Sequence, residues 1–137
     1  MKKKIVFILA MLAVRGILWV IFRNARDTDQ PKVFYRKRLF NNYNGYIVPP
    51  FGIFIKESER DNTALMEHEL MHWKQFQREG FAAFLFHYGK EAYQKGYDKN
   101  PYEIEARTVE TGYCKENYTD CVRSGKAVTV HNPQFRK

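Results

Sequence analysis

The chain has 137 residues, of which 45% are hydrophobic and 16% aromatic, so it can bury one hydrophobic core but not the cores of two full domains. The formal net charge of +8 lies within residues 1–38, which hold ten basic and two acidic residues, whereas residues 39–137 hold equal numbers of each. A basic block beside an apolar run suits an anionic membrane surface, and because no nucleic-acid-binding module accompanies the charge, we expect no nucleic-acid partner.

The apolar run IVFILAMLAVRGILWVIF covers residues 5–22 and follows three lysines. Eighteen residues just reach the lower limit for a membrane-spanning helix. Arg15 at its centre costs about 2.5–3.5 kcal/mol, which some ten strongly apolar residues at about 0.3–0.6 kcal/mol each just offset. Residues 1–26 are therefore predicted to form an uncleaved hydrophobic anchor. A cleaved signal segment and an ordinary core or surface helix are the alternatives.

The side of the membrane is left open by two opposing signals. Basic residues after the apolar run favour a domain on the cytoplasmic side, whereas lysines before such a run are typical of exported proteins that face the periplasm or cell exterior. Cys114 and Cys121, the two cysteines, would lie about 10.5 Å apart along one straight helix, too far for a disulfide. Reduced packing residues are the favoured interpretation, with a bridged loop in an oxidising compartment as the alternative.

Residues 27–137 are predicted to form one α+β domain. A strand is expected within KVFYRKR (residues 32–38), and two more in GYIVPPFGIFIKE (residues 45–57), separated by a pair of prolines. Because prolines are tolerated at strand starts and sheet edges, Phe51–Lys56 is predicted to be an edge strand. Turn and capping residues then mark three helices, at about residues 63–79, 81–95 and 101–117.

The first of these helices carries the strongest chemical signal. At 100° per residue its apolar side chains cluster on one face, and Glu69 falls in the middle of that face with His68 and His72 along its edge. A buried, unpaired carboxylate costs several kcal/mol, which a bound divalent metal would offset. Imidazoles four residues apart on a helix can converge on one tetrahedral ion.

The stretch His68-Glu69-Leu70-Met71-His72 resembles the HExxH pattern of the zincin metallopeptidases. The resemblance implies a small sheet with about three helices, Zn²⁺ bound by His68 and His72, and Glu69 as the base that takes a proton from water. It also implies a peptide or protein substrate that is held along the edge strand. The implied activity is zinc-dependent hydrolysis of peptide bonds.

The third zinc ligand is expected from the last helix, within NPYEIEAR. The sequence looks like the zincin branch with a glutamate ligand, in whose membrane-linked members a pattern E-x-x-A-D supplies the ligand through its first glutamate. This makes Glu103 the expected ligand, but Arg107 stands where the aspartate would. Two alternatives stay open: that Glu105 is the ligand instead, and that Glu103 only closes a capping box with Asn100.

A further group is expected to stabilise negative charge on the substrate carbonyl oxygen, with Tyr102, Arg107 and His87 as candidates. Two other functions remain open beside peptide hydrolysis. One is a membrane-anchored binding or structural protein in which zinc only joins helices, and the other is a zinc amidase that acts on a cell-wall bond.

Overall fold

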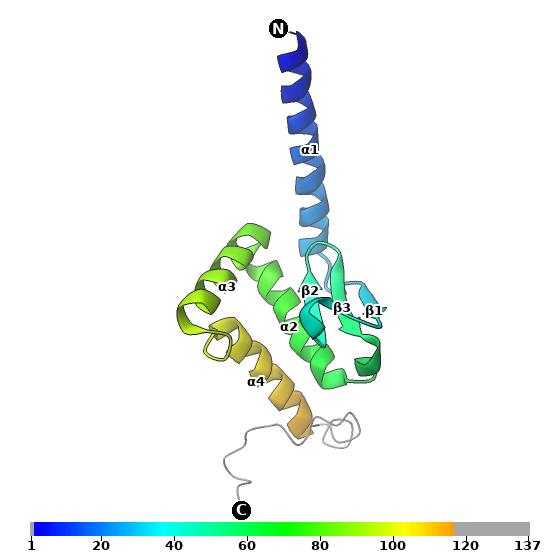
Figure 1. Cartoon of the computed structure of the whole chain (residues 1–137), viewed down its shortest axis with the longest axis vertical. Helices are drawn as coiled ribbons and strands as arrows, with labels where there is room; N and C mark the ends of the chain where they lie inside the picture. Colours follow the sequence, from blue (N-terminus) through cyan, green and yellow to red (C-terminus); the bar gives the residue numbers. More distant parts are fainter. Residues whose placement is uncertain (1, 117–137) are drawn as a thin grey trace, which may run out of the picture.

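The computed structural model describes residues 2–116, which form an α+β fold with four α-helices, two short 3-10 helices and one three-stranded sheet (Figure 1). In chain order the elements are α1 (Lys2–Arg26), β1 (Val33–Arg36), η1 (Phe40–Asn42), β2 (Gly45–Val48), β3 (Gly52–Lys56), η2 (Glu57–Glu59), α2 (Thr63–Glu79), α3 (Phe81–Lys95) and α4 (Pro101–Glu116). The predicted α+β class is confirmed, and the three predicted helices and three predicted strands are all present.

The limits of α2 follow from its capping residues. The side chain of Asn62 accepts a hydrogen bond from the backbone N–H of Leu65 at 3.0 Å, which satisfies one of the free donors of the first turn. At the other end Gly80 adopts φ +84°, a conformation that favours glycine, and its N–H bonds to the carbonyl of Phe76. The chain therefore turns directly from α2 into α3.

The sheet has the strand order β1-β3-β2, with β1 parallel and β2 antiparallel to β3. The prediction that Phe51–Lys56 is an edge strand is therefore wrong, because β3 is the central strand. Pro49 and Pro50 lie in the turn before β3, so they remove no hydrogen-bond donor from its ladder. The two edges belong to β1 and β2.

Helix α2 is the central element of the domain (Figure 1). It packs against β2 and β3 through Leu65, which lies among the fully buried Ile53 and Ile55. Its C-terminal half contributes Trp73 and Phe76 to a second cluster with α1 and α3. Because α4 also packs along α2, this helix is held from several sides, which fixes the side chains that it carries.

Helix α1 projects away from the rest of the molecule in Figure 1. Among the α1 side chains that the structure describes, those at its C-terminal end are packed: Ala25 is buried, and Phe22 contacts the cluster around Trp73 and Phe76. The alternative of an ordinary core helix is therefore wrong for most of α1, since large apolar side chains from Leu9 to Ile21 are exposed. Within the described residues, no helix combines the length and the apolar character needed to cross a membrane.

Cys114 lies buried near the end of α4 and is disulfide-bonded. The favoured interpretation of Cys114 as a reduced packing residue is therefore wrong. The distance argument behind it assumed one straight helix through both cysteines. Cys121 lies outside the described residues, as does the end of the predicted domain 27–137.

Candidate metal centre

The two histidines of α2 converge as their spacing predicts. Four residues apart on one face, His68 and His72 place their Nε2 atoms 3.2 Å from each other, and both side chains are buried. The rings meet nearly edge to face, with an interplanar angle of 79°. Two imidazole nitrogens therefore point at one small region of space, as metal ligands do.

Glu103 of α4 completes this group. Its Oε1 lies 3.2 Å from His72 Nε2 and its Oε2 lies 3.4 Å from His68 Nε2, and the residue is only 2% exposed. Within residues 2–116, these three residues form a group whose ligand atoms all lie within 4.8 Å of one another, close enough to hold a metal ion. The structure thus brings together the three predicted ligands.

The two alternatives for the third ligand do not match the structure. Glu105 points to another side of α4, where its carboxylate pairs with Arg78 at 3.0 Å and accepts a hydrogen bond from Gln75 at 2.9 Å. Glu103 does not close a capping box with Asn100, because its carboxylate faces the two histidines. The N-cap bond of α4 instead comes from Asn100 Oδ1, which accepts from the N–H of Tyr102.

Each of the three residues is oriented by a second group. His68 Nδ1 lies 3.2 Å from a carboxylate oxygen of Glu110, and His72 Nδ1 lies 2.8 Å from Gln75 Oε1. The hydroxyl of Tyr88 donates to Glu103 Oε1 at 2.6 Å. Carboxylate and amide oxygens at the distal ring nitrogen orient metal-binding histidines in this way. Arg107 stands in place of the aspartate of the E-x-x-A-D pattern, and Glu110, one helical turn later, supplies a carboxylate beside His68.

The charges of the group are complementary. Burial by itself would raise the pKa of the Glu103 carboxyl, but the adjacent His68 and His72 rings and the hydrogen bond from Tyr88 outweigh burial and lower that pKa well below its usual value. Burial also opposes charge on His68, but the carboxylates of Glu103 and Glu110 beside it prevail and raise its pKa to about 9. Without metal, a proton on His68 balances the buried carboxylate. A divalent cation would displace that proton.

Glu69 lies beside this group on the same face of α2 and is only 4% exposed. Its Oε1 is close to the backbone of β2, because a Cβ atom built on Gly45 would lie 2.9 Å from Oε1 and 3.0 Å from Ile55 Cδ1. Real Cβ atoms are not found that close to other heavy atoms. A glycine at position 45 therefore leaves room for the Glu69 carboxylate next to the edge strand.

Gly45→Ala is expected to displace the Glu69 carboxylate, because the added methyl group would lie 2.9 Å from its Oε1. Any hydrolysis that depends on this carboxylate should slow by up to about a hundredfold, since small misplacements of a reacting group are this costly. Metal binding by His68, His72 and Glu103 should not change, because the nearest neighbours of a Cβ built at position 45 belong to Glu69 and Ile55. Gly89→Ala is the matched control, since nothing lies within 4 Å of a Cβ built there on exposed α3 surface. Steady-state kinetics with metal analysis measures both; equal rates for the two variants would contradict this role of Gly45.

A cleft of about 580 Å³ opens over the group of His68, His72 and Glu103. It runs between β2 with its preceding turn on one side and α3 on the other, with α2 and α4 at its base. The lining residues are Phe40, Tyr43, Gly45, Tyr46, Ile47, His68, Glu69, His72, Phe84, Leu85, Tyr88, Ala92, Tyr97 and Glu103. The ligand group and Glu69 are thus accessible from a cleft lined mainly by apolar and aromatic side chains.

The predicted candidates for stabilising charge on a substrate lie outside this cleft. Tyr102 donates to Glu79, and His87 pairs with the same carboxylate at 2.9 Å on the surface. Arg107 bonds to Asp98 and to the carbonyl of Glu103. Residue type and nearness in sequence do not determine which face of a helix meets the cleft.

Two tyrosines, rather than those three candidates, lie in the cleft. Tyr88 comes from α3, and Tyr97 comes from the turn between α3 and α4; both line the cleft with the ligand group. Burial and the nearby Glu103 carboxylate raise the pKa of both hydroxyls, so they stay protonated and can donate hydrogen bonds. In the sequence, the one feature that pointed to these two tyrosines was their position in an aromatic helix and in the turn after it.

No family model, curated protein or solved structure matches the chain.

Proposed function

We propose that this protein is a zinc-dependent hydrolase of the zincin type that cleaves peptide bonds with a metal-activated water. The observation that carries the proposal is the buried carboxylate of Glu69, which follows a ligand histidine directly and faces the same cleft as the three ligands. A metal that only joins helices needs no such carboxylate. General bases, by contrast, must lie within reach of the reacting water.

Zinc is the metal that the donor set favours. Two neutral imidazoles and one carboxylate are a common ligand set of catalytic zinc sites, which leave the fourth position to water or substrate. Oε2 of Glu103 is buried and has no hydrogen-bond partner, although it lies 3.4 Å from His68 Nε2, so an ion between these atoms would satisfy it. When bound, zinc would lower the pKa of a water and polarise a carbonyl oxygen.

The roles of the protein side chains follow from their positions. Glu69 accepts the proton of the attacking water and later delivers it to the leaving amine. Tyr88 keeps the Glu103 carboxylate turned toward the two histidines through its 2.6 Å hydrogen bond. Tyr97, whose side chain is half exposed in the cleft, is placed to donate a hydrogen bond to the carbonyl oxygen as negative charge develops there.

The position of β2 supports a peptide as the substrate. β2 pairs with β3 on one side, and its residues Gly45, Tyr46 and Ile47 line the cleft. An edge strand offers backbone donors and acceptors to an extended peptide, which adds to the sheet as a further strand. A peptide bound there would pass the ligand group and Glu69. This assigns to β2 the substrate-binding role that we expected for β3.

The outer part of the cleft favours large apolar substrate side chains. Phe40, Tyr43 and Leu85 line it and are all about half exposed or more. Exposed apolar side chains gathered around a cleft mark binding sites. Peptides with a bulky apolar residue next to the cleaved bond are therefore the proposed substrates, rather than the polar sugars and short side chains of a cell-wall bond.

We also propose that α1 associates the domain with a membrane. Its apolar side chains from Leu9 to Ile21 are exposed, and basic residues lie at both ends of the helix. Such a helix is attracted to anionic lipid by charge and buries its apolar surface in the acyl region. The disulfide at Cys114 fits a domain in an oxidising compartment, such as the periplasm or cell exterior.

The proposed activity is tested with the purified chain, zinc and a peptide library that varies the residues around each bond. We expect cleavage next to large apolar residues, loss of cleavage with a zinc chelator, and recovery on addition of zinc. A protein that binds zinc and cleaves no peptide would favour the structural role of the metal. Release of amines from purified cell wall, with all peptides intact, would favour the amidase.

A further inference from the structure

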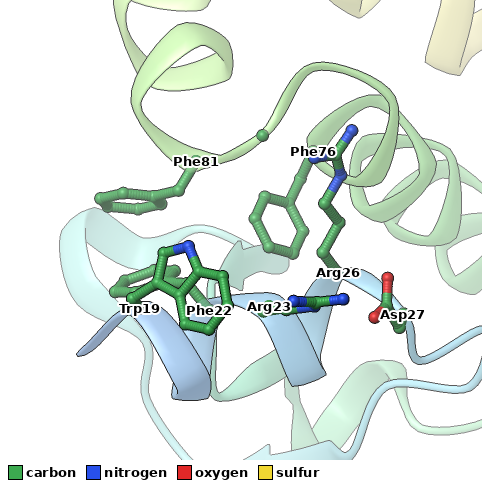
Figure 2. A pocket seen from close by; sticks show the side chains of 8 residues that line it. Trp19, Phe22, Arg23, Arg26, Asp27, Phe76 and Phe81 are labelled. Atoms are coloured by element: carbon green, nitrogen blue, oxygen red, sulfur yellow. The ribbon is translucent and has the colours of Figure 1, made fainter. Parts of the chain in front are cut away.

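A second cavity, remote from the metal centre, lies where α1 meets the domain (Figure 2). It has a volume of about 500 Å³, is open to solvent, and is bordered by the C-terminal end of α1, the end of α2 and the start of α3. The lining residues are Trp19, Phe22, Arg23, Arg26, Asp27, Phe76, Gly80 and Phe81. We call it the α1 pocket.

One side of the α1 pocket is aromatic. The rings of Phe22 and Phe81 pack against each other at a tilt of 35°, with their centroids 4.5 Å apart, and Trp19 lies next to them in Figure 2. Trp19 is 59% exposed and is followed toward the N-terminus by the exposed apolar side chains of α1. The aromatic side of the pocket is thus continuous with the apolar surface that we propose for membrane association.

The other side of the pocket is charged, with Arg23, Arg26 and Asp27 (Figure 2). The Arg23 guanidinium lies over the Trp19 ring, 5.0 Å from its centroid. Arg26 donates from Nε alone to the carbonyl of Gln77 at 2.8 Å, a bond that leaves its terminal nitrogens for another acceptor. Within residues 2–116 neither arginine forms a salt bridge, so two guanidinium groups face one carboxylate.

The pocket is built on a rigid junction. Gln77 donates to the carbonyls of Arg26 and Thr28, both at 2.9 Å, and the buried Trp73 donates to Thr28 at 3.0 Å. These bonds tie the end of α1 to α2 and so fix the backbone that carries Arg23 and Arg26. Guanidinium groups bind phosphate oxygens with directed, charge-assisted hydrogen bonds.

We propose that the α1 pocket binds the phosphate head of an anionic lipid, with Arg23 and Arg26 on the phosphate and the first part of an acyl chain against Trp19, Phe22 and Phe81. The arginines supply the charge that an anionic head requires. The aromatic side suits a lipid better than free phosphate, because inorganic phosphate would leave those rings in contact with water. The inference rests on membrane association of α1 and is independent of the hydrolase.

The test uses the full-length chain and vesicles of phosphatidylcholine with and without phosphatidylglycerol. Arg23→Gln/Arg26→Gln is compared with Arg36→Gln/Arg38→Gln, which removes two exposed charges from the same basic region but outside the pocket. Each exposed charge near a membrane contributes about fivefold to the affinity. The control pair should therefore lose this general attraction for its two charges and nothing more. On anionic vesicles the pocket pair is expected to lose at least about tenfold more affinity than the control pair, because it also loses the directed hydrogen bonds to phosphate. On neutral vesicles the two pairs should bind equally.

Three results would overturn the proposal. Equal losses for the two pairs would mean general charge attraction only, and displacement of the protein by inorganic phosphate at vesicle-like concentrations would mean a free-phosphate site. No binding to either vesicle would remove membrane association and the lipid site together, while zinc-dependent hydrolysis stays separately measurable. Arg23→Gln alone, which breaks no hydrogen bond within residues 2–116, checks that the double variant has not simply lost its fold.

Discussion

For the proposed zinc hydrolase, Glu69→Gln is expected to reduce peptide hydrolysis by about 10²–10⁴-fold and to leave the zinc content equal to that of the parent. Glutamine keeps the size of the side chain next to Gly45 but cannot take up a proton. The three ligands are untouched, so the metal should remain bound. Single-turnover rates measured with zinc-loaded protein, together with metal analysis of the same sample, give both quantities.

Glu67→Gln is the matched control for this substitution. Glu67 lies two residues earlier in α2 and does not line the cleft. Its substitution by glutamine therefore removes the same charge without removing the proposed base. Its rate should equal that of the parent. Unchanged turnover in Glu69→Gln would show that another group takes the proton. Loss of zinc from that variant would instead make Glu69 part of the metal site.

Glu103→Gln is expected to weaken zinc binding by more than about a hundredfold, because even groups that only orient a ligand contribute about 10–100-fold. The substitution removes the negative charge that faces His68 and His72 but keeps an oxygen that can accept from Tyr88. Competition with a zinc chelator of known affinity measures the change. Circular dichroism shows whether the variant keeps its fold.

Glu105→Gln tests the same chemical change two residues away on α4. Its carboxylate pairs with Arg78 and Gln75, and because that ion pair is partly exposed, its loss should have little effect on stability and none on zinc. The reverse ranking of the two variants would move the third ligand to Glu105. Two unchanged zinc affinities would show that neither glutamate holds the metal.

Much of this protein follows from its sequence, because the relevant interactions are local. The limits of α2 are set by Asn62 and Gly80, and the convergence of His68 and His72 is a property of any helix with that spacing. The burial of Glu69 follows equally from its place among apolar side chains on one helical face. Which face of α2 is buried is therefore set by the sequence of that helix, whichever elements come to cover it.

The third member of the group depended on tertiary structure. Glu103 and Glu105 lie two residues apart on α4, so the rotation of that helix against α2 decides which carboxylate meets the histidines. The same packing brings Glu110 to His68 and turns Arg107 toward Asp98. A pattern in one helix contains no information about its rotation against another, which is why Glu105 stayed open as an alternative.

The cleft shows the same division. The strands were predictable from their composition, but their order in the sheet comes from pairing between distant segments, and it is this order that makes β2 an edge strand beside Glu69. Tyr88 and Tyr97 reach the cleft only because α3 folds back against α2. The sequence thus determined the elements and the two histidines with Glu69. The packing of α3, α4 and β2 around α2 decided what surrounds them, because those contacts join residues that are far apart in the chain.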